Sequence, residues 1–188
     1  MGNDNSKLHR ARRGLDLPIT GAPKSSDVTG GPQSKKVAVV AADYVGMRPS
    51  FKVKEGDPVL RGQAIFEDRK NPGVVFTSPG CGTVAAINRG ERRALQTVVI
   101  ELSEADRDEA ANEVSYDAYG GQEPSEITAV QVRELLIESG LWTCLRARPF
   151  SKVPAVDSKP SALFITAMDS NPLAPKPEAI LGKKKEQF

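Results

Sequence analysis

Residues 53–67 decide the fold, and they read Val53-Lys54-Glu55-Gly56-Asp57-Pro58-Val59-Leu60-Arg61-Gly62-Gln63-Ala64-Ile65-Phe66-Glu67. The segments Glu55–Pro58 and Arg61–Gln63 have the composition of tight turns, because glycine accepts a positive φ and proline fixes its own φ. Short apolar runs flank both turns. The stretch therefore predicts short strands that are joined by tight turns.

The same pattern extends in both directions from this stretch. Further turn compositions occur at Pro79-Gly80-Cys81-Gly82 and at Asn88-Arg89-Gly90. Between the turns we expect strands at residues 37–42, 51–53, 64–67, 74–77, 83–88 and 97–102. Many short strands at even spacing favour a compact barrel or sandwich.

A helix is predicted further along, over about residues 128–139. Thr128 and Gln131 have the spacing of a capping box, and Ile127 can pack against Val132. Apolar residues then recur at three- and four-residue spacing, and Gly140 is placed to end the helix in the left-handed conformation.

The C-terminal third indicates a second, α/β domain. The segment 142–159 is expected to be extended, and Ser161–Met168 is a continuous apolar run, typical of a strand that is buried on both faces. A further helix is expected over residues 178–188. One strand and two helices cannot complete a doubly wound sheet, so we expect this domain to be incomplete.

Composition and charge exclude several classes of protein. The 188 residues carry 26 basic and 24 acidic side chains, a net charge of +2, which gives no global attraction to nucleic acid. The longest apolar runs are too short to cross a bilayer, so we expect no direct insertion into a membrane. The N-terminus lacks the apolar segment of a secretory signal, and two cysteines do not form a disulfide framework. A reducing cytoplasm is the predicted location.

Charge and turn composition also divide the chain. We predict an N-terminal arm over residues 1–35, partly flexible, and a β module over 36–102. Residues 103–126 are predicted to be an acidic linker, because eight carboxylates face the single base Arg107 there. Residues 127–188 are assigned to the α/β domain.

The quoted stretch, taken with Ser78–Val84, resembles the lipoyl- and biotinyl-carrier family. That family has the same Gly-Asp turn, the same Gly-Gln turn and a later Pro-x-x-Gly-x-Val strand entry, and the resemblance implies a barrel-sandwich hybrid fold. Carriers hold their cofactor on a lysine at a hairpin tip, and the nearest equivalent is Lys70. Its neighbours differ from those of a modified lysine, and Pro72-Gly73 changes the turn, so we expect Lys70 to be unmodified.

A second resemblance covers nearly the whole chain and is more specific. Six strings, in order, are similar to the A subunit of the bacterial sodium-translocating NADH:quinone oxidoreductase. They are Gly14–Ile19, Asp43–Pro49, Phe66–Phe76, Gly140–Thr143, Arg148–Pro154 and Ala167–Leu173. The fold class expected from both resemblances is mixed: an all-β barrel-sandwich hybrid module, then the start of an incomplete α/β, Rossmann-like domain.

The second resemblance implies a peripheral scaffold or docking component that is not catalytic by itself. Its complex couples NADH oxidation and ubiquinone reduction to sodium export. The resemblance places the NADH, flavin and iron–sulfur sites on other subunits of the same membrane complex, with ubiquinone near this one. The expected location is the cytoplasmic side of the cell membrane, held there through those partner subunits. Family members are considerably longer, so we expect part of the protein to be absent.

Two surface segments are candidates for contact with a partner or an anion. Arg146, Arg148 and Lys152 surround Phe150, and guanidinium groups beside an aromatic face suit carboxylates and phosphates. Tyr44 and Arg48 form the second candidate. The alternative for each segment is an ordinary charged loop.

The remaining polar residues have simpler interpretations. His9 is interpreted as a solvated histidine, Cys81 as a residue that fills a turn, and Cys144 as a small buried hydrophobe near Trp142. The segment Asp169–Asn171 follows the expected strand, where α/β folds place sites, although helix capping explains it equally well. Two other functions stay open: a carrier domain that is modified on Lys70, and a stand-alone adaptor that binds an anionic partner.

Overall fold

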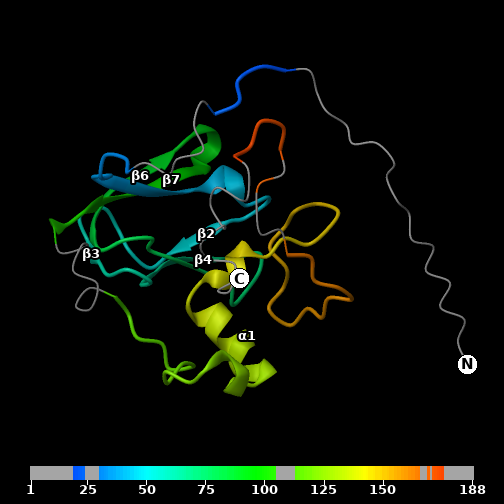
Figure 1. Cartoon of the computed structure of the whole chain (residues 1–188). Helices are drawn as coiled ribbons and strands as arrows, with labels where there is room; N and C mark the ends of the chain where they lie inside the picture. The colour runs from blue at the N-terminus through cyan, green and yellow to red at the C-terminus, as the bar shows by residue number, and fades with distance from the viewer. Residues whose placement is uncertain (1–18, 24–29, 105–112, 166–168, 170, 176–188) are drawn as a thin grey trace, which may run out of the picture. The chain divides into compact units, whose positions relative to one another are not determined.

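The computed structural model describes residues 19–23, 30–104, 113–165, 169 and 171–175 (Figure 1). The chain divides into two compact units, Gln33–Pro160 and a second unit that combines Met1–Pro32 with Ser161–Phe188. The described strands and helices all lie in the unit Gln33–Pro160.

Two antiparallel sheets form the β module. The first has the order β1 (Lys36–Val40), β7 (Leu95–Leu102), β6 (Gly82–Arg89) and β3 (Pro58–Val59). The second has the order β2 (Pro49–Phe51), β4 (Ala64–Asp68) and β5 (Val75–Thr77). Short 3-10 helices lie at η1 (Ala41–Asp43), η2 (Glu91–Arg93), η4 (Pro124–Glu126) and η5 (Leu141–Cys144), and α1 is Ala129–Glu138. The mixed β and α content agrees with the predicted fold class.

The predicted turns position the strands. Gly56 and Gly62 both have positive φ, 89° and 82°, as the turn composition predicted. The Gly56 N–H donates to the Val84 carbonyl at 2.9 Å, and the Val84 N–H donates to the Asp57 carbonyl at 2.9 Å. These bonds tie the turn at residues 54–57 directly to β6.

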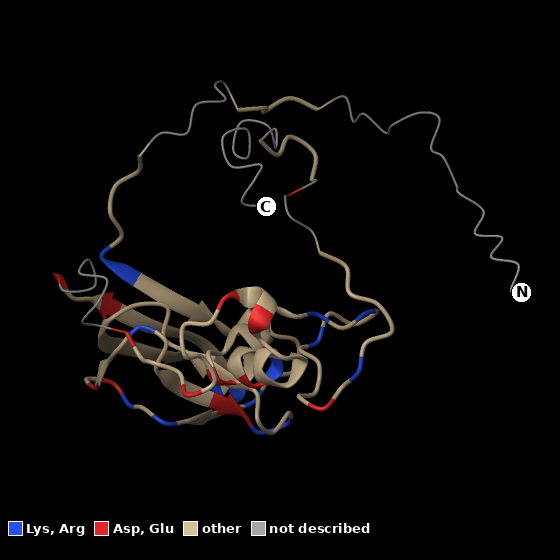
Figure 2. Cartoon of the chain, turned by 60° about the horizontal axis from the view of Figure 1, so that its bottom comes forward, with Lys and Arg blue, Asp and Glu red and all other residues tan. Residues whose placement is uncertain are grey.

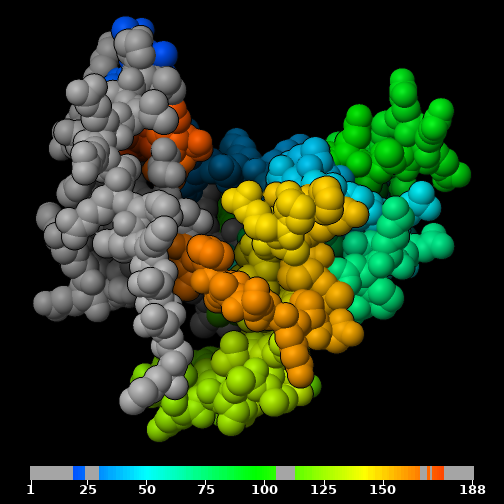
Figure 3. Space-filling model, turned by 90° about the vertical axis from the view of Figure 1, so that its right-hand side faces the viewer, coloured from blue at the N-terminus to red at the C-terminus, as the bar shows by residue number. Residues whose placement is uncertain are grey.

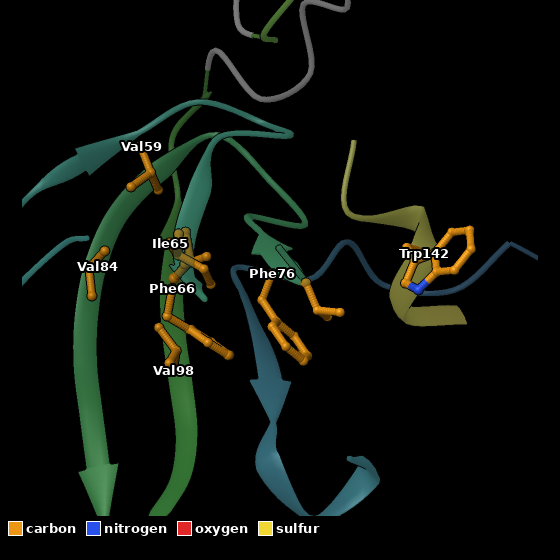
Figure 4. Packing of buried hydrophobic residues seen from close by; sticks show 9 residues of the cluster. Val59, Ile65, Phe66, Phe76, Val84, Val98 and Trp142 are labelled. Atoms are coloured by element: carbon orange, nitrogen blue, oxygen red, sulfur yellow. The ribbon is translucent and has the colours of Figure 1, made fainter. Parts of the chain in front are cut away.

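The core lies between the two sheets and extends to η5 (Figure 4). It consists of Val59, Ile65, Phe66, Val74, Phe76, Val84, Val98, Ile100 and Trp142, which are all buried (Figure 4). The rings of Phe66 and Phe76 stack with their centroids 4.5 Å apart. Burying one such side chain stabilises a fold by about 1.5–3 kcal/mol, so this cluster is the main source of stability of the module.

Each strand predicted for the β module is present in the structure, and β3 is a strand that the sequence did not predict. The sequence placed a turn up to Pro58, whereas Pro58–Val59 pairs with Thr83 and Gly82 of β6. The strand expected at 51–53 lies two residues earlier, at Pro49–Phe51, because Lys54 already belongs to the next turn and its N–H donates to the Asp57 carboxylate. A two-residue strand has too little pattern to be detected in the sequence.

The helix prediction is confirmed, including both ends. Thr128 and Gln131 form the capping box, since the Gln131 N–H donates to Thr128 Oγ1 and the Thr128 N–H donates to Gln131 Oε1. Gly140 follows with φ 77°. Thr77 Oγ1 of β5 donates to the Ser139 carbonyl at 3.0 Å, which anchors this end of α1 on the β module.

Three expectations for the C-terminal part are wrong where the structure describes it. Residues 161–165 form no strand, and Leu163, Phe164 and Ile165 are 66%, 90% and 81% exposed. A doubly buried strand needs neighbours on both faces, and the described residues of this unit supply none. The segment 142–159 begins with the helical turn η5 rather than an extended chain, and Cys144, expected to be buried, is exposed.

Other predictions lie outside the described residues. These are the helix over 178–188, most of the string Gly14–Ile19, and His9. Among the described residues, no helix combines the length and the apolar character that crossing a bilayer requires.

Candidate functional site

The tip of the hairpin between β4 and β5 carries Lys70, as the resemblance to carriers predicted. Asp68, which is 8% exposed, organises this tip. Its Oδ1 accepts the N–H groups of Lys70 and of Arg48, both at 2.9 Å. The Arg69 N–H also donates to the Arg48 carbonyl at 2.8 Å. The tip and the loop before β2 are therefore held together by the buried Asp68 carboxylate and by a direct backbone bond.

The tip also contacts the segment 145–158, which follows η5 and is called the strap here. Asn71 Nδ2 donates to the carbonyls of Val153 and Pro154, at 3.2 and 3.1 Å. A Cβ placed on Gly73 would lie 3.4 Å from the side chain of Val156. The hairpin tip is thus packed beneath the strap and is not free on all sides.

The strap is in turn bound to α1 and η5. Trp142 Nε1 donates to the Pro154 carbonyl at 2.9 Å, so Pro154 O accepts from both the tip and the core tryptophan. The Arg133 guanidinium of α1 donates to the carbonyls of Val156 and Ser158 and lies over the Trp142 ring, with Cζ 5.2 Å from the centroid. Hairpin tip, strap and helix form one connected assembly.

Arg146 links the strap to the loop after β1. Its Cζ lies 5.0 Å from the centroid of the Tyr44 ring, and Nη2 donates to the Asp43 carbonyl at 3.4 Å. Nη1 donates to the carbonyls of Thr143 and Leu145. Tyr44 packs edge-on against Phe76, with the centroids 4.7 Å apart. Two candidates that the sequence left separate, Tyr44 and Arg146, therefore contact each other.

The strap then makes a tight turn that presents three of the predicted residues. The Ala147 N–H donates to the Lys152 carbonyl at 2.8 Å and closes the turn. At its tip Phe150 is 73% exposed, and Arg148 and Lys152 are exposed on either side. In Figure 3 the yellow residues of this region lie beside the light-blue loop after β1.

The other residues that the sequence analysis named do not join this surface. Cys81 is buried, in agreement with its predicted place in a turn. In the second unit the Asn171 N–H donates to Asp169 Oδ1 at 2.9 Å, which is an ordinary local turn. The described residues contain no group of three or more His, Cys, Asp or Glu side chains arranged to hold a metal ion.

Sequence reasoning missed the role of Tyr116. Its hydroxyl donates to the Gly62 carbonyl at 3.3 Å, and the Val114 N–H donates to the Arg61 carbonyl at 3.0 Å. These bonds hold the described end of the acidic segment against the β module. Burial raises the pKa of Tyr116, and the carboxylates of Glu138 and Glu113 raise it further. The sequence did offer one signal of this contact, because Tyr116 is an aromatic residue within an otherwise acidic segment.

An open groove of about 470 Å³ lies beside β3 and β6. Pro58, Leu60 and Cys81 contribute to its apolar lining, and Gln63 and Ser103 supply polar groups. The groove brings together no acid–base pair and no cluster of charge. The exposed turn of the strap, with the loops around Arg48 and Lys70, is therefore the candidate functional site, and its chemistry is that of binding through cations and one aromatic ring.

Comparison with known proteins matches two family descriptions to consecutive parts of the chain. Residues 10–103 match the NqrA N-terminal barrel-sandwich hybrid domain, and residues 127–188 match the NqrA second alpha/beta domain. The first match covers the two sheets described above. It therefore agrees with both the observed strands and the predicted barrel-sandwich hybrid.

Longer relatives show the same similarity. The chain is 52% identical over 177 residues to the A subunit of the Na(+)-translocating NADH-quinone reductase of Glaesserella parasuis serovar 5. It is 50% identical over 179 residues to the protein of the same name from Neisseria meningitidis serogroup B, and 50% identical over 177 residues to that from Histophilus somni. These alignments include 94–95% of this chain but 38% of each relative.

Proposed function

The chain belongs to the NqrA family, the A subunits of the Na(+)-translocating NADH-quinone reductases, and from this premise we propose that it acts as a docking and scaffold component of such a complex. It contains the N-terminal barrel-sandwich hybrid domain and residues of the second α/β domain. The proposed work is positional: the chain holds neighbouring redox subunits in place. Sodium export and electron transfer are properties of the assembled complex in this proposal.

The clamped hairpin tip is the observation that carries the proposal. A swinging-arm carrier must place its lysine tip in the active sites of other proteins, so the surface around that tip has to be accessible. Here Asn71 is bonded to two carbonyls of the strap, and Asp68 holds the backbone beside Lys70. These contacts support a fixed surface for assembly.

The cofactor sites follow from the same proposal. We place NADH, flavin and iron–sulfur centres on other subunits, with ubiquinone near this one. The chain would sit at the cytoplasmic side of the membrane through contacts with those subunits. The presence of exposed cations and Phe150 on one hydrogen-bonded turn supports attachment through a protein surface.

Membranes that retain the other subunits but lack NqrA test the proposal. The purified chain is mixed with these membranes and, in parallel, with membranes that lack the whole complex. We expect it to sediment with the first and to remain in solution with the second. The purified chain should show no flavin absorbance and no NADH oxidation. Equal sedimentation with both membranes, a stoichiometric flavin, or turnover of NADH would each contradict the proposal.

A carrier function is the second candidate, because Lys70 is exposed at the predicted hairpin tip. The intact mass of the chain, after expression together with a lipoyl or biotinyl ligase, separates the two candidates. We expect the unmodified mass. A mass increase that a Lys70→Arg variant abolishes would establish the carrier.

A further inference from the structure

Three loops that lie far apart in sequence are joined by hydrogen bonds and are rich in basic residues. The loop at 43–48, the hairpin tip at 68–71 and the strap turn at 146–152 together contribute six cations. The exposed parts of these loops are called the basic face, and the six cations, all exposed, are Arg48, Arg69, Lys70, Arg146, Arg148 and Lys152. The loops are joined by three hydrogen bonds: the Arg69 N–H donates to the Arg48 carbonyl, Asn71 donates to the carbonyl of Val153 directly after the strap turn, and Arg146 donates to the carbonyl of Asp43.

The basic face has little opposing charge of its own. The same three loops contain two carboxylates, Asp43 and Asp68, so six cations against two acids leave a net charge of +4. Asp68 is buried and accepts backbone N–H groups, which leaves Asp43 as the exposed acid. The whole chain carries +2, so the rest of the chain, with a net charge of −2, is slightly acidic. Figure 2 shows blue segments on the loops around the helix.

Phe150 gives the basic face a fixed apolar contact. The turn that carries it is closed by the bond between Ala147 and Lys152, and the strap below is held by Trp142 and Arg133. A ring that is 73% exposed on such a support loses little conformational freedom when it binds. Aromatic and arginine side chains of this kind are enriched among the residues that dominate binding energy.

We propose that the basic face binds an acidic protein surface with an apolar socket for Phe150, on a neighbouring component of the complex. The inference rests on the proposed docking function and names the chemistry of the partner. Three of the six cations, Arg48, Arg69 and Arg148, are exposed arginines, which pair with carboxylates through two parallel hydrogen bonds. The guanidinium of Arg146 already donates to carbonyls of its own chain, so it contributes its charge. A protein surface matches this fixed geometry better than lipid does, because binding to a bilayer uses a broad apolar face, and the large apolar side chains exposed in these loops are Phe150 and Val45 alone.

Binding to the membranes that lack NqrA tests the inference with matched variants. The double variant Arg148→Glu with Lys152→Glu reverses two charges of the basic face. The control, Arg92→Glu with Arg93→Glu, makes the same change of charge in the exposed hairpin between β6 and β7. Phe150→Ala removes the ring alone. Thermal unfolding of each variant establishes that it is folded, and vesicles of lipid extracted from the same membranes form a separate arm.

The expected result is specific to the basic face. The double variant should weaken binding by roughly tenfold or more at low salt, and added salt should reduce that difference. Phe150→Ala should weaken binding by roughly tenfold, since a central aromatic contributes most where water is excluded. The control should change binding by less than about threefold, because charges outside an interface act mainly on the rate of association.

Each other outcome overturns a defined part of the proposal. If the wild-type chain binds but the basic-face variant binds equally well, or the control loses as much, the inference is wrong and the docking function stands. Equal retention on the lipid vesicles would assign the basic face to lipid and overturn the protein partner. If the wild-type chain fails to bind these membranes at all, the proposed function fails, and the inference fails with it.

Discussion

Arg146 connects parts of the chain that are 103 residues apart in sequence. Its guanidinium donates to the carbonyls of Thr143 and Leu145 at the end of η5. It also donates to the carbonyl of Asp43 in the loop after β1. The same group covers the ring of Tyr44, whose edge reaches the core at Phe76. One side chain thus links the strap to the core of the β module.

Replacing Arg146 by alanine should lower the stability of the fold. We expect the free energy of unfolding to fall by about 1–2 kcal/mol, because the contact with Tyr44 and several hydrogen bonds to carbonyls are lost together. Arg148→Ala is the matched control, since Arg148 is exposed and lies two residues away; it should change stability by less than about 0.5 kcal/mol. Urea unfolding measures both. Equal effects would show that Arg146 has no special structural role.

Tyr116 makes the free energy of unfolding depend on pH in the alkaline range. Its pKa is raised above the ordinary value of 10.0 by burial and then by Glu138 and Glu113. The folded chain therefore keeps the phenolic proton at a pH where the unfolded chain has lost it. The unfolded state then binds fewer protons, so stability falls as pH rises above about 10.

Tyr116→Phe tests this dependence. Near neutral pH the variant should be close to the wild type in stability, because the bond to Gly62 is long at 3.3 Å. As pH rises above about 10, the wild type should lose stability relative to the variant. Chemical unfolding from about pH 8 to about pH 11 gives the difference. Parallel curves for the two proteins across this range would rule out the proposed ionisation.

At the scale of elements, α1 is determined by its ends. The capping box satisfies two backbone donors at the N-terminus, the N–H groups of Thr128 and Gln131, and Gly140 ends the helix in a conformation that is unfavourable for other residues. A Cβ on Gly140 would also lie 2.7 Å from Thr77 Oγ1 and 2.9 Å from Thr77 Cγ2. Gly140 is therefore needed for both the turn and the close approach of β5.

Two glycine substitutions separate these contributions. Gly140→Ala should destabilise by about 2–4 kcal/mol, of which about 1–2 kcal/mol comes from the left-handed backbone and the rest from the clash with Thr77. Gly121 has a similar φ of 83° with open space around it, so Gly121→Ala should show the backbone part alone. Thermal or urea unfolding compares them. Equal losses would mean that the contact with Thr77 contributes nothing.

Local signals explain which elements the sequence predicted. The turns at Gly56 and Gly62 and the ends of α1 depend on residues within four positions of each other, so their chemistry is visible in sequence. β3 and the strap depend on partners far away: Pro58–Val59 is a strand because β6 lies beside it, and the strap is held by Asn71 and Trp142. No period or turn composition records such contacts.

At the scale of the whole molecule, the candidate site was likewise predictable in its local features and not in its long-range contacts. The residue types of the basic face were predictable, and Arg148, Phe150 and Lys152 are exposed as a binding segment requires. Their position next to the loops of Arg48 and Lys70 was not predictable, because hydrogen bonds between residues far apart in sequence bring these loops together. The predicted strand at Ser161–Met168 failed in its described part for a related reason: an apolar run is buried only where neighbouring strands cover it.

The central claim is that the chain docks neighbouring subunits and does not carry a cofactor on Lys70. The mobility of the hairpin tip tests this claim most directly. We expect backbone ¹⁵N order parameters of about 0.85 at Lys70, Asn71 and Gly73, because the strap holds the tip. These values should equal those of β4 and β5. Asn71→Ala should lower the values at the tip and leave those of the strands unchanged. Order parameters below about 0.6 at the tip of the wild-type chain would show a free arm and contradict the docking function.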